Sequence, residues 1–194
     1  KRNIEKYFKQ PNYYKIDGKP VVAIYDIANF VNGLGGYENA KKSIAWLNEE
    51  AKKYGLPGVH FQYIKWGDEN NNFTGVDSSK IDISGGDFIV DLGFESVTNY
   101  QFVHFMDMDR DYGEIIKELP DEYEKIRTGI NLPYFPHVSV GWDNNPRYID
   151  KVEPVCTNAT PDKVEDAMRM AKAYADKYND VPLVVVNSWN EWTE

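Results

Sequence analysis

Short apolar runs alternate with amphipathic segments from one end of the chain to the other. The apolar runs are continuous rather than interrupted at every second position, which is typical of strands buried on both faces of a parallel sheet. The segments between them carry apolar residues three or four positions apart, which predicts helices with one buried face. We predict strands at residues 21–25, 59–64, 95–100, 134–140 and 182–187, and helices at 37–54, 112–126 and 160–178.

Capping residues mark the ends of the predicted helices. Gly55 and Pro57 follow the first helix, and Thr160 and Pro161 precede the last one as its N-cap and first helical residue. Pro120 either kinks the middle helix or starts a new one. The alternation of strand and helix predicts an α/β fold in which helices cover a parallel sheet.

Residues 67–93 form a polar stretch rich in Asn, Asp, Ser and Gly. The stretch is longer than an ordinary connection, so we expect an insertion with some structure of its own or a long functional loop. Its residues Asp77, Asp82 and Asp87 lack the spacing of a calcium-binding loop, which favours a solvated loop. Because the chain contains no internal repeat and no convincing linker, we expect residues 1–194 to form a single domain.

The composition narrows the classes of partner. Apolar residues make up 42% of the 194 residues, enough for a sizeable core, and the net charge is −9. An acidic protein is a poor partner for nucleic acid, because a phosphate backbone requires a basic surface. The longest apolar runs, such as 181–186, are too short to span a bilayer. The chain shows no targeting segment and begins at Lys1, so both a cytoplasmic and an exported location stay open.

The sequence lacks the usual signatures of metal and nucleotide sites. Cys156 is the only cysteine and the chain has three histidines, which excludes an internal disulfide and makes a zinc site by the common spacings implausible. No dinucleotide fingerprint, phosphate-cradling loop or serine-hydrolase elbow occurs, and the glycine-rich segment 33–36 matches none of them. We therefore expect neither a metal nor a cofactor.

Aromatic and polar residues follow the predicted strands. Parallel sheets carry their chemistry at the carboxyl ends of the strands, in open sheets and in barrels alike. Aromatic side chains there are suited to stacking on the apolar faces of sugar rings. The residues in question are Tyr25, Trp66, Tyr100, Trp142, Asp143, Trp189, Asn190 and Trp192.

Glu191 and Glu194 stand three residues apart just after the last predicted strand. In a helical turn this spacing places both carboxylates on one side, where repulsion raises one pKa and favours a shared proton. Two carboxylates beside aromatic residues are typical of a glycosidase site. An ordinary helix start with acidic first-turn residues explains the same pair. Spacing by itself leaves both interpretations open.

Three segments carry a resemblance to a known family. Residues 187–194, with the sequence Asn-Ser-Trp-Asn-Glu-Trp-Thr-Glu, resemble the Asn-Ala-Trp-Asn-Glu-Trp-x-Glu signature of WbsX-type polysaccharide-biosynthesis proteins. These proteins are related to glycoside hydrolase family 99, the endo-α-mannosidases. Residues 138–147 are similar to the family's Gly-Trp-Asp-Asn-Thr-Pro-Arg, and residues 14–21 resemble the segment leading into a strand of its barrel.

The resemblance implies a (β/α)₈ barrel, of which this chain would supply about five strands and would be incomplete at both ends. It also implies a retaining glycoside hydrolase that acts on α-mannoside-like glycans. In that family the first Glu of the motif assists attack by the sugar's 2-hydroxyl and the second is the general acid/base. Carried over, Glu191 is the assisting base, Glu194 is the acid/base, and Asp143 and Arg147 contact the substrate or support residues that do.

Two other functions stay open at this stage. A polysaccharide-biosynthesis glycosyltransferase fits the usual description of WbsX-type proteins, and a non-catalytic carbohydrate-binding barrel fits the aromatic strand ends. In each case the expected partners are an oligosaccharide or polysaccharide and the missing remainder of the barrel, with no nucleic acid and no membrane span.

Overall fold

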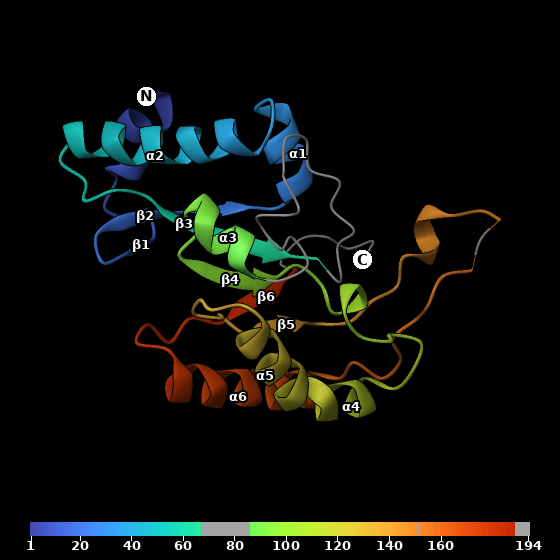
Figure 1. The fold of residues 1–194 in the computed structure, drawn as a ribbon. Helices are drawn as coiled ribbons and strands as arrows, with labels where there is room; N and C mark the ends of the chain where they lie inside the picture. Colours follow the sequence, from blue (N-terminus) through green and yellow to red (C-terminus); the bar gives the residue numbers. More distant parts are fainter. Residues whose placement is uncertain (67–85, 151, 189–194) are drawn as a thin grey trace. The chain divides into compact units, whose positions relative to one another are not determined.

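The computed structural model describes residues 1–66, 86–150 and 152–188 of the chain (Figure 1). The predicted residues at 189–194 and most of the stretch 67–93 therefore lie outside the described residues. The chain divides into two compact units, which we describe one at a time. Of the described residues, the first unit comprises 1–64, 86–97 and 129–132, and the second comprises 65–66, 98–128, 133–150 and 152–188.

A sheet and the helices that flank it organise the first unit. Strands β1 and β2 form an antiparallel hairpin, in which Asp17 and Gly18 make the turn with positive φ values of 51° and 76°. Strand β2 then pairs in parallel with β3, with Val21 opposite His60. The sheet order is β1-β2-β3-β4. The elements are η1 (Ile4–Phe8), β1 (Lys15–Ile16), β2 (Lys19–Ile24), α1 (Ile27–Gly33), α2 (Tyr37–Lys53), β3 (His60–Lys65), α3 (Asp87–Leu92) and β4 (Ser96–Asn99).

Helix α2 follows the predicted apolar face, because Tyr37, Ala40, Ile44 and Ala51 are all buried. The helix ends where Gly55 adopts a positive φ of 81°, as its C-cap signal predicts. Tyr37 fixes α2 beside α3, since its hydroxyl donates a hydrogen bond to Asp91 Oδ2 at 2.8 Å. The hydrogen bond from Lys41 to the same carboxylate, together with this bond from Tyr37, lowers the pKa of Asp91.

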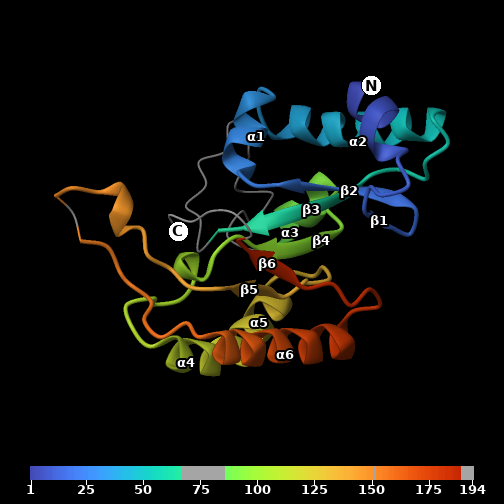
Figure 2. The ribbon, with the colours of Figure 1, turned by 180° about the vertical axis from the view of Figure 1, so that it is seen from behind.

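A two-stranded parallel sheet and three helices form most of the second unit. Strands β5 and β6 pair with His137 opposite Val185 and Ser139 opposite Asn187. Helices α5 and α6 lie along one side of this sheet in both views (Figures 1 and 2). The elements are η2 (Phe102–His104), α4 (Tyr112–Ile115), η3 (Ile116–Glu118), α5 (Leu119–Gly129), β5 (His137–Ser139), η4 (Asn145–Arg147), α6 (Pro161–Tyr178) and β6 (Val185–Asn187).

Small and aromatic side chains build the core of the second unit. Helix α6 contributes Ala167, Ala171 and Ala175, each fully buried, and small residues of this kind allow a helix to approach its neighbours closely. The buried phenol of Tyr123 is satisfied because its hydroxyl donates to the carbonyl oxygen of His137 at 2.5 Å. Helix α5 is thereby joined to β5 by a hydrogen bond as well as by apolar packing.

The predicted elements occur within a few residues of their expected bounds, with some corrections. Strand β5 is shorter than predicted and starts after Pro136, whose ring nitrogen cannot donate to a ladder. Leu119 begins a new helix, so Pro120 starts α5 rather than kinking a longer one. Thr160 occupies the N-cap position of α6, but its side chain makes no capping hydrogen bond.

The expected single parallel sheet is only partly correct. The described residues form an α/β fold with two sheets, one of which carries the unpredicted antiparallel strand β1. Helix α1 was also not predicted. No helix in the described part of the chain has the length and apolarity needed to cross a membrane.

Candidate functional site

The described candidate residues divide between the two units. Tyr25 follows β2 in the first unit, where its side chain is 43% exposed. The next residue, Asp26, caps α1 by accepting a hydrogen bond from the backbone N–H of Asn29 at 2.8 Å. The second unit contains Trp66, Tyr100, Trp142, Asp143 and Arg147. Glu191, Glu194, Trp189, Asn190 and Trp192 lie outside the described residues, so their roles stay predictions.

Three rings form a stacked cluster in the second unit. The rings of Trp66 and His104 are nearly parallel, with centroids 4.6 Å apart, and those of Trp66 and Tyr100 lie 5.7 Å apart at an angle of 14°. The centroids of Tyr100 and His104 are also 5.7 Å apart. If they lay on opposite faces of the indole, this last distance would be nearly twice as long. Tyr100 and His104 therefore lie on the same side of Trp66.

Side-chain hydrogen bonds fix the backbone that carries these rings. The amide of Asn99 donates to the carbonyl of Lys65, next to Trp66, at 3.2 Å. The amide of Asn187 donates to the carbonyl of Tyr100 at 2.8 Å. These bonds join strand ends that are far apart in the sequence. The ring cluster, which we define as Trp66, Tyr100 and His104, is therefore positioned by buried polar side chains rather than by ring contacts alone.

Ser139 and His137 anchor the helical turn η2, which carries His104. The hydroxyl of Ser139 accepts a hydrogen bond from the backbone N–H of Phe102 at 2.9 Å and lies 3.0 Å from His137 Nε2. Neither side chain is exposed to solvent. Burial, with a smaller contribution from the nearby His104, lowers the pKa of His137 to about 3. His137 is therefore neutral at pH 7 and serves as a hydrogen-bonding group rather than as a charge.

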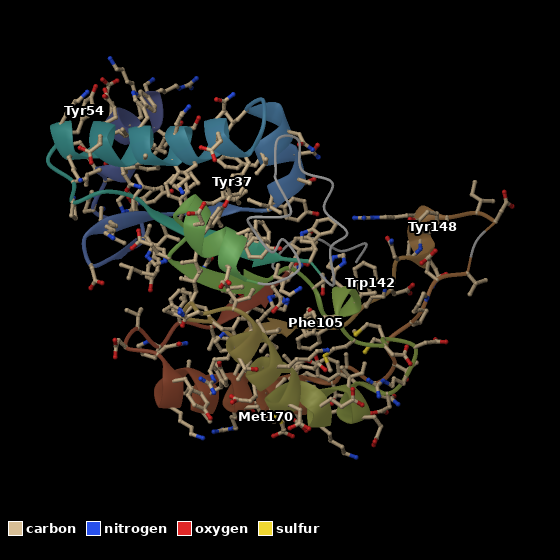
Figure 3. All side chains as sticks on the ribbon, in the orientation of Figure 1. Tyr37, Tyr54, Phe105, Trp142, Tyr148 and Met170 are labelled. Atoms are coloured by element: carbon tan, nitrogen blue, oxygen red, sulfur yellow. The ribbon has the colours of Figure 1, made fainter. Side chains whose placement is uncertain are left out.

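The loop after β5 contains the predicted residues Trp142, Asp143 and Arg147. Figure 3 shows Trp142 where the loop leaves the sheet and Tyr148 further out along it. Asp143 Oδ1 accepts hydrogen bonds from the backbone N–H and the side-chain amide of Asn145, both at 3.0 Å. Asp143 therefore shapes the loop, while Arg147 lies in the turn η4 and is exposed.

Sequence patterns did not identify His104, Asn99 or Ser139 as members of this site. His104 was detectable in principle, because it is one of only three histidines and follows a predicted strand end by four residues. Asn99 and Ser139 sit within predicted strands and have no local feature that separates them from ordinary polar residues. Their role depends on partners that are distant in the sequence.

The described residues contain no group of three or more His, Cys, Asp or Glu side chains that could hold a metal ion. Cys156 is half-buried on the returning arm of the loop after β5, where burial raises the pKa of its thiol. A raised thiol pKa does not favour a reactive thiolate.

A sequence-family model described as Glycosyltransferase WbsX matches residues 1–194. The chain belongs to the WbsX glycosyltransferase family. This family is carbohydrate-active, and its match confirms the resemblance expected from the three sequence segments. No curated protein sequence matches the chain significantly.

Solved structures related to the WbsX chain confirm its α/β fold. The family 99 endo-alpha-mannosidase from Bacteroides thetaiotaomicron matches with a TM-score of 0.60 at 15% identity, covering 99% of this chain and 48% of that one. The same enzyme in complex with bis-tris-propane matches with a TM-score of 0.58 at 15% identity, over 99% and 50%. A glycoside hydrolase-like protein matches with a TM-score of 0.59 at 14% identity, over 98% and 49%.

The WbsX chain spans about half the length of the solved structures that it matches. At these identities the likeness concerns the fold alone, which is that of enzymes built on a TIM barrel. The complete eight-stranded barrel is not confirmed by the described residues.

Proposed function

We propose that this chain is part of a retaining glycoside hydrolase that cleaves α-mannoside-like glycans. The observation that carries the proposal is the match of nearly the whole chain to the fold of an endo-alpha-mannosidase. Membership of a carbohydrate-active family and the aromatic cluster at the strand ends support it. A parallel α/β sheet carries its site at these strand ends, so the cluster has the position expected of substrate-binding residues.

The proposed chemistry uses two carboxyl groups. Glu194 protonates the glycosidic oxygen as its bond to the anomeric carbon breaks, while Glu191 accepts the proton of the 2-hydroxyl as O2 attacks that carbon. The product is an anhydro-sugar. Glu194 then deprotonates a water molecule that opens this ring at the anomeric carbon, and Glu191 returns its proton to O2. Both carboxyl groups regain their starting states and the anomeric configuration is retained.

The ring cluster supplies the proposed binding surface for sugar rings. Sugar rings present apolar C–H faces to aromatic side chains, and each ring buries a large area on contact. We include His104 with the binding residues predicted from the sequence, because it stacks on Trp66. Those predicted residues are Tyr25, Trp66, Tyr100, Trp142, Asp143, Arg147, Trp189, Asn190 and Trp192.

Hydrolysis of α-mannan by the full-length protein tests the proposal. Glu194→Gln should lower kcat by about 10² to 10⁴-fold, the range for loss of a general acid/base. The matched control is Glu165→Gln, which removes an exposed carboxylate from α6 and should leave kcat unchanged. Absence of α-mannan cleavage by the unaltered protein, or equal rates for it and Glu194→Gln, would contradict the proposal.

A polysaccharide-biosynthesis glycosyltransferase is the second candidate, because the matching family model carries that description. Transfer from a nucleotide sugar requires affinity for the nucleotide diphosphate. Calorimetric titration of the full-length protein with nucleotide sugars separates the two functions. Saturable binding together with failure to cleave α-mannan would favour the transferase. Sugar binding without either activity would favour a non-catalytic carbohydrate-binding barrel.

We also propose that further chain completes the sheet at β6. Among the described residues β6 pairs with β5 alone, and Val186 in its centre is 47% exposed. An unpaired strand edge with an exposed apolar residue promotes association. Residues 1–194 expressed alone should therefore aggregate more readily than the full-length protein, as measured by light scattering during heating. Equal aggregation of the two proteins would contradict this role of the β6 edge.

A further inference from the structure

Two buried polar atoms on the loop after β5 have no hydrogen-bond partner among the residues that the structure describes. They are the indole nitrogen Nε1 of Trp142 and the amide oxygen Oδ1 of Asn144. Buried polar atoms are nearly always paired, because leaving one unpaired forfeits its hydration without replacement. The two atoms therefore point to a partner from outside the described protein.

The loop around these atoms is otherwise densely bonded. The carbonyl of Trp142 accepts a hydrogen bond from the backbone N–H of Cys156 at 2.9 Å, and Asp143 forms an antiparallel bridge with Val155. Asn145 donates to the carbonyl of Glu153 at 3.1 Å and accepts from its N–H at 2.8 Å. The unpartnered atoms thus lie on a braced loop, so poor packing of the loop does not explain them.

The two atoms belong to the residues on either side of Asp143. Asp143, between them, accepts hydrogen bonds from Asn145. This stretch of the loop therefore offers one N–H donor, on Trp142, and one amide-oxygen acceptor, on Asn144.

This combination selects a chemical class of ligand. An indole Nε1–H only donates a hydrogen bond, and an amide oxygen only accepts one. A hydroxyl group does both, so the hydroxyl groups of a sugar satisfy either atom. A carboxylate or phosphate would meet the lone pairs of Asn144 Oδ1, and an apolar ligand would satisfy neither atom.

We propose that Trp142 Nε1 and Asn144 Oδ1 bind hydroxyl groups of the glycan and determine which sugar the protein accepts. The inference rests on the proposed function and adds to it the hydroxyl-binding pair, with Asn144 as a specificity-determining residue. Trp142 then acts through its N–H as well as through its ring face.

The test replaces each polar atom while keeping the shape of its side chain. Trp142 is replaced by β-(3-benzothienyl)alanine, in which sulfur substitutes for the N–H, and Asn144→Leu removes the amide. Each full-length variant should bind α-mannan oligosaccharides about tenfold more weakly in calorimetry, because one hydrogen bond is lost. The Tm without ligand should stay unchanged or rise, because the free protein loses no internal hydrogen bond.

The chain offers a matched control in Tyr174. Its hydroxyl is also buried without a hydrogen-bond partner among the described residues, but it lies on α6 in the helical layer beside Tyr123 and Tyr134. Tyr174→Phe should leave both the Tm and the Kd for the oligosaccharides unchanged, or raise the Tm alone. Asn144→Asp keeps an acceptor oxygen and should retain more affinity than Asn144→Leu.

The outcomes separate this inference from the proposed function. If the unaltered protein binds the oligosaccharides and both variants bind them equally well, the hydroxyl-binding pair is wrong and the proposed function stands. A fall in Tm with unchanged Kd would likewise overturn the pair, because it would show a role within the fold. If the unaltered protein binds no α-mannan oligosaccharide, both the proposed function and this inference are overturned.

Discussion

The substitution Ser139→Ala removes a hydroxyl that serves two buried groups at once. Ser139 Oγ accepts the backbone N–H of Phe102 at 2.9 Å and pairs with His137 Nε2 at 3.0 Å, with no exposure to solvent. Alanine keeps Cβ, so the substitution opens almost no cavity. It leaves two buried polar atoms without partners, each at a cost of about 1–3 kcal/mol. We expect the free energy of unfolding to fall by roughly 2–5 kcal/mol.

Urea-induced unfolding of the full-length protein, monitored by circular dichroism, measures this loss as a lower urea concentration at the midpoint of unfolding. Ser43→Ala is the matched control, because the Ser43 hydroxyl is exposed on α2 and bonds only to the carbonyl of Asn39 among the described residues. The control should change the free energy by less than about 0.5 kcal/mol. If Ser139→Ala were as small in effect as Ser43→Ala, the buried hydroxyl would not anchor η2.

Three further predictions concern buried and charged groups. The pKa of His137 is about 3 against an ordinary 6.5, so between these values the unfolded chain binds more protons and the free energy of unfolding falls by up to about 1.4 kcal/mol per pH unit as the pH drops from 6.5. His137→Gln should reduce the dependence of the urea midpoint on pH between pH 4.5 and 6.5. An unchanged dependence would refute this prediction. Hydrogen bonds from Lys163, Asn158 and the Gly113 N–H lower the pKa of Asp111 to about 2, so the contribution of its carboxylate to the free energy of unfolding is present above pH 4 and lost as the pH falls towards 2. Asp111→Asn should remove this part of the acid-induced unfolding transition. An identical midpoint pH for the variant and the unaltered protein would count against it. Tyr37→Phe removes the hydrogen bond to Asp91 and should lower the free energy of unfolding by about 1 kcal/mol. A lower urea midpoint would measure this loss, and an unchanged midpoint would contradict the prediction.

Local patterns were sufficient to predict most of the helices and strands. The apolar spacing of α2 and the Pro161 start of α6 depend on residues within a few positions of one another, so the sequence shows them directly. Strand β1, which forms a hairpin with the predicted strand β2, was missed because its two residues are too few to show a periodicity. Helix α1 was also missed, and in the structure the carboxylate of Asp26 caps it.

The candidate site was predicted only in part. Trp66 and Tyr100 were identifiable because they follow apolar strands, and the structure brings their rings together. His104 joins them through the turn η2, whose position depends on a hydrogen bond from Phe102 to Ser139, 37 residues further along the chain. No spacing rule for a single segment connects residues so far apart.

The sequence alone determined the order of strands and helices, the family, and the acidic pair Glu191 and Glu194 as candidates for catalysis. Each of these depends on residue type and on spacing over short distances. The tertiary structure decided which polar residues support the ring cluster. The hydrogen bond of Asn99 spans 34 residues and that of Asn187 spans 87. Such contacts form only when the sheets assemble, because it is the packing of the strands that brings those amides to their carbonyl partners.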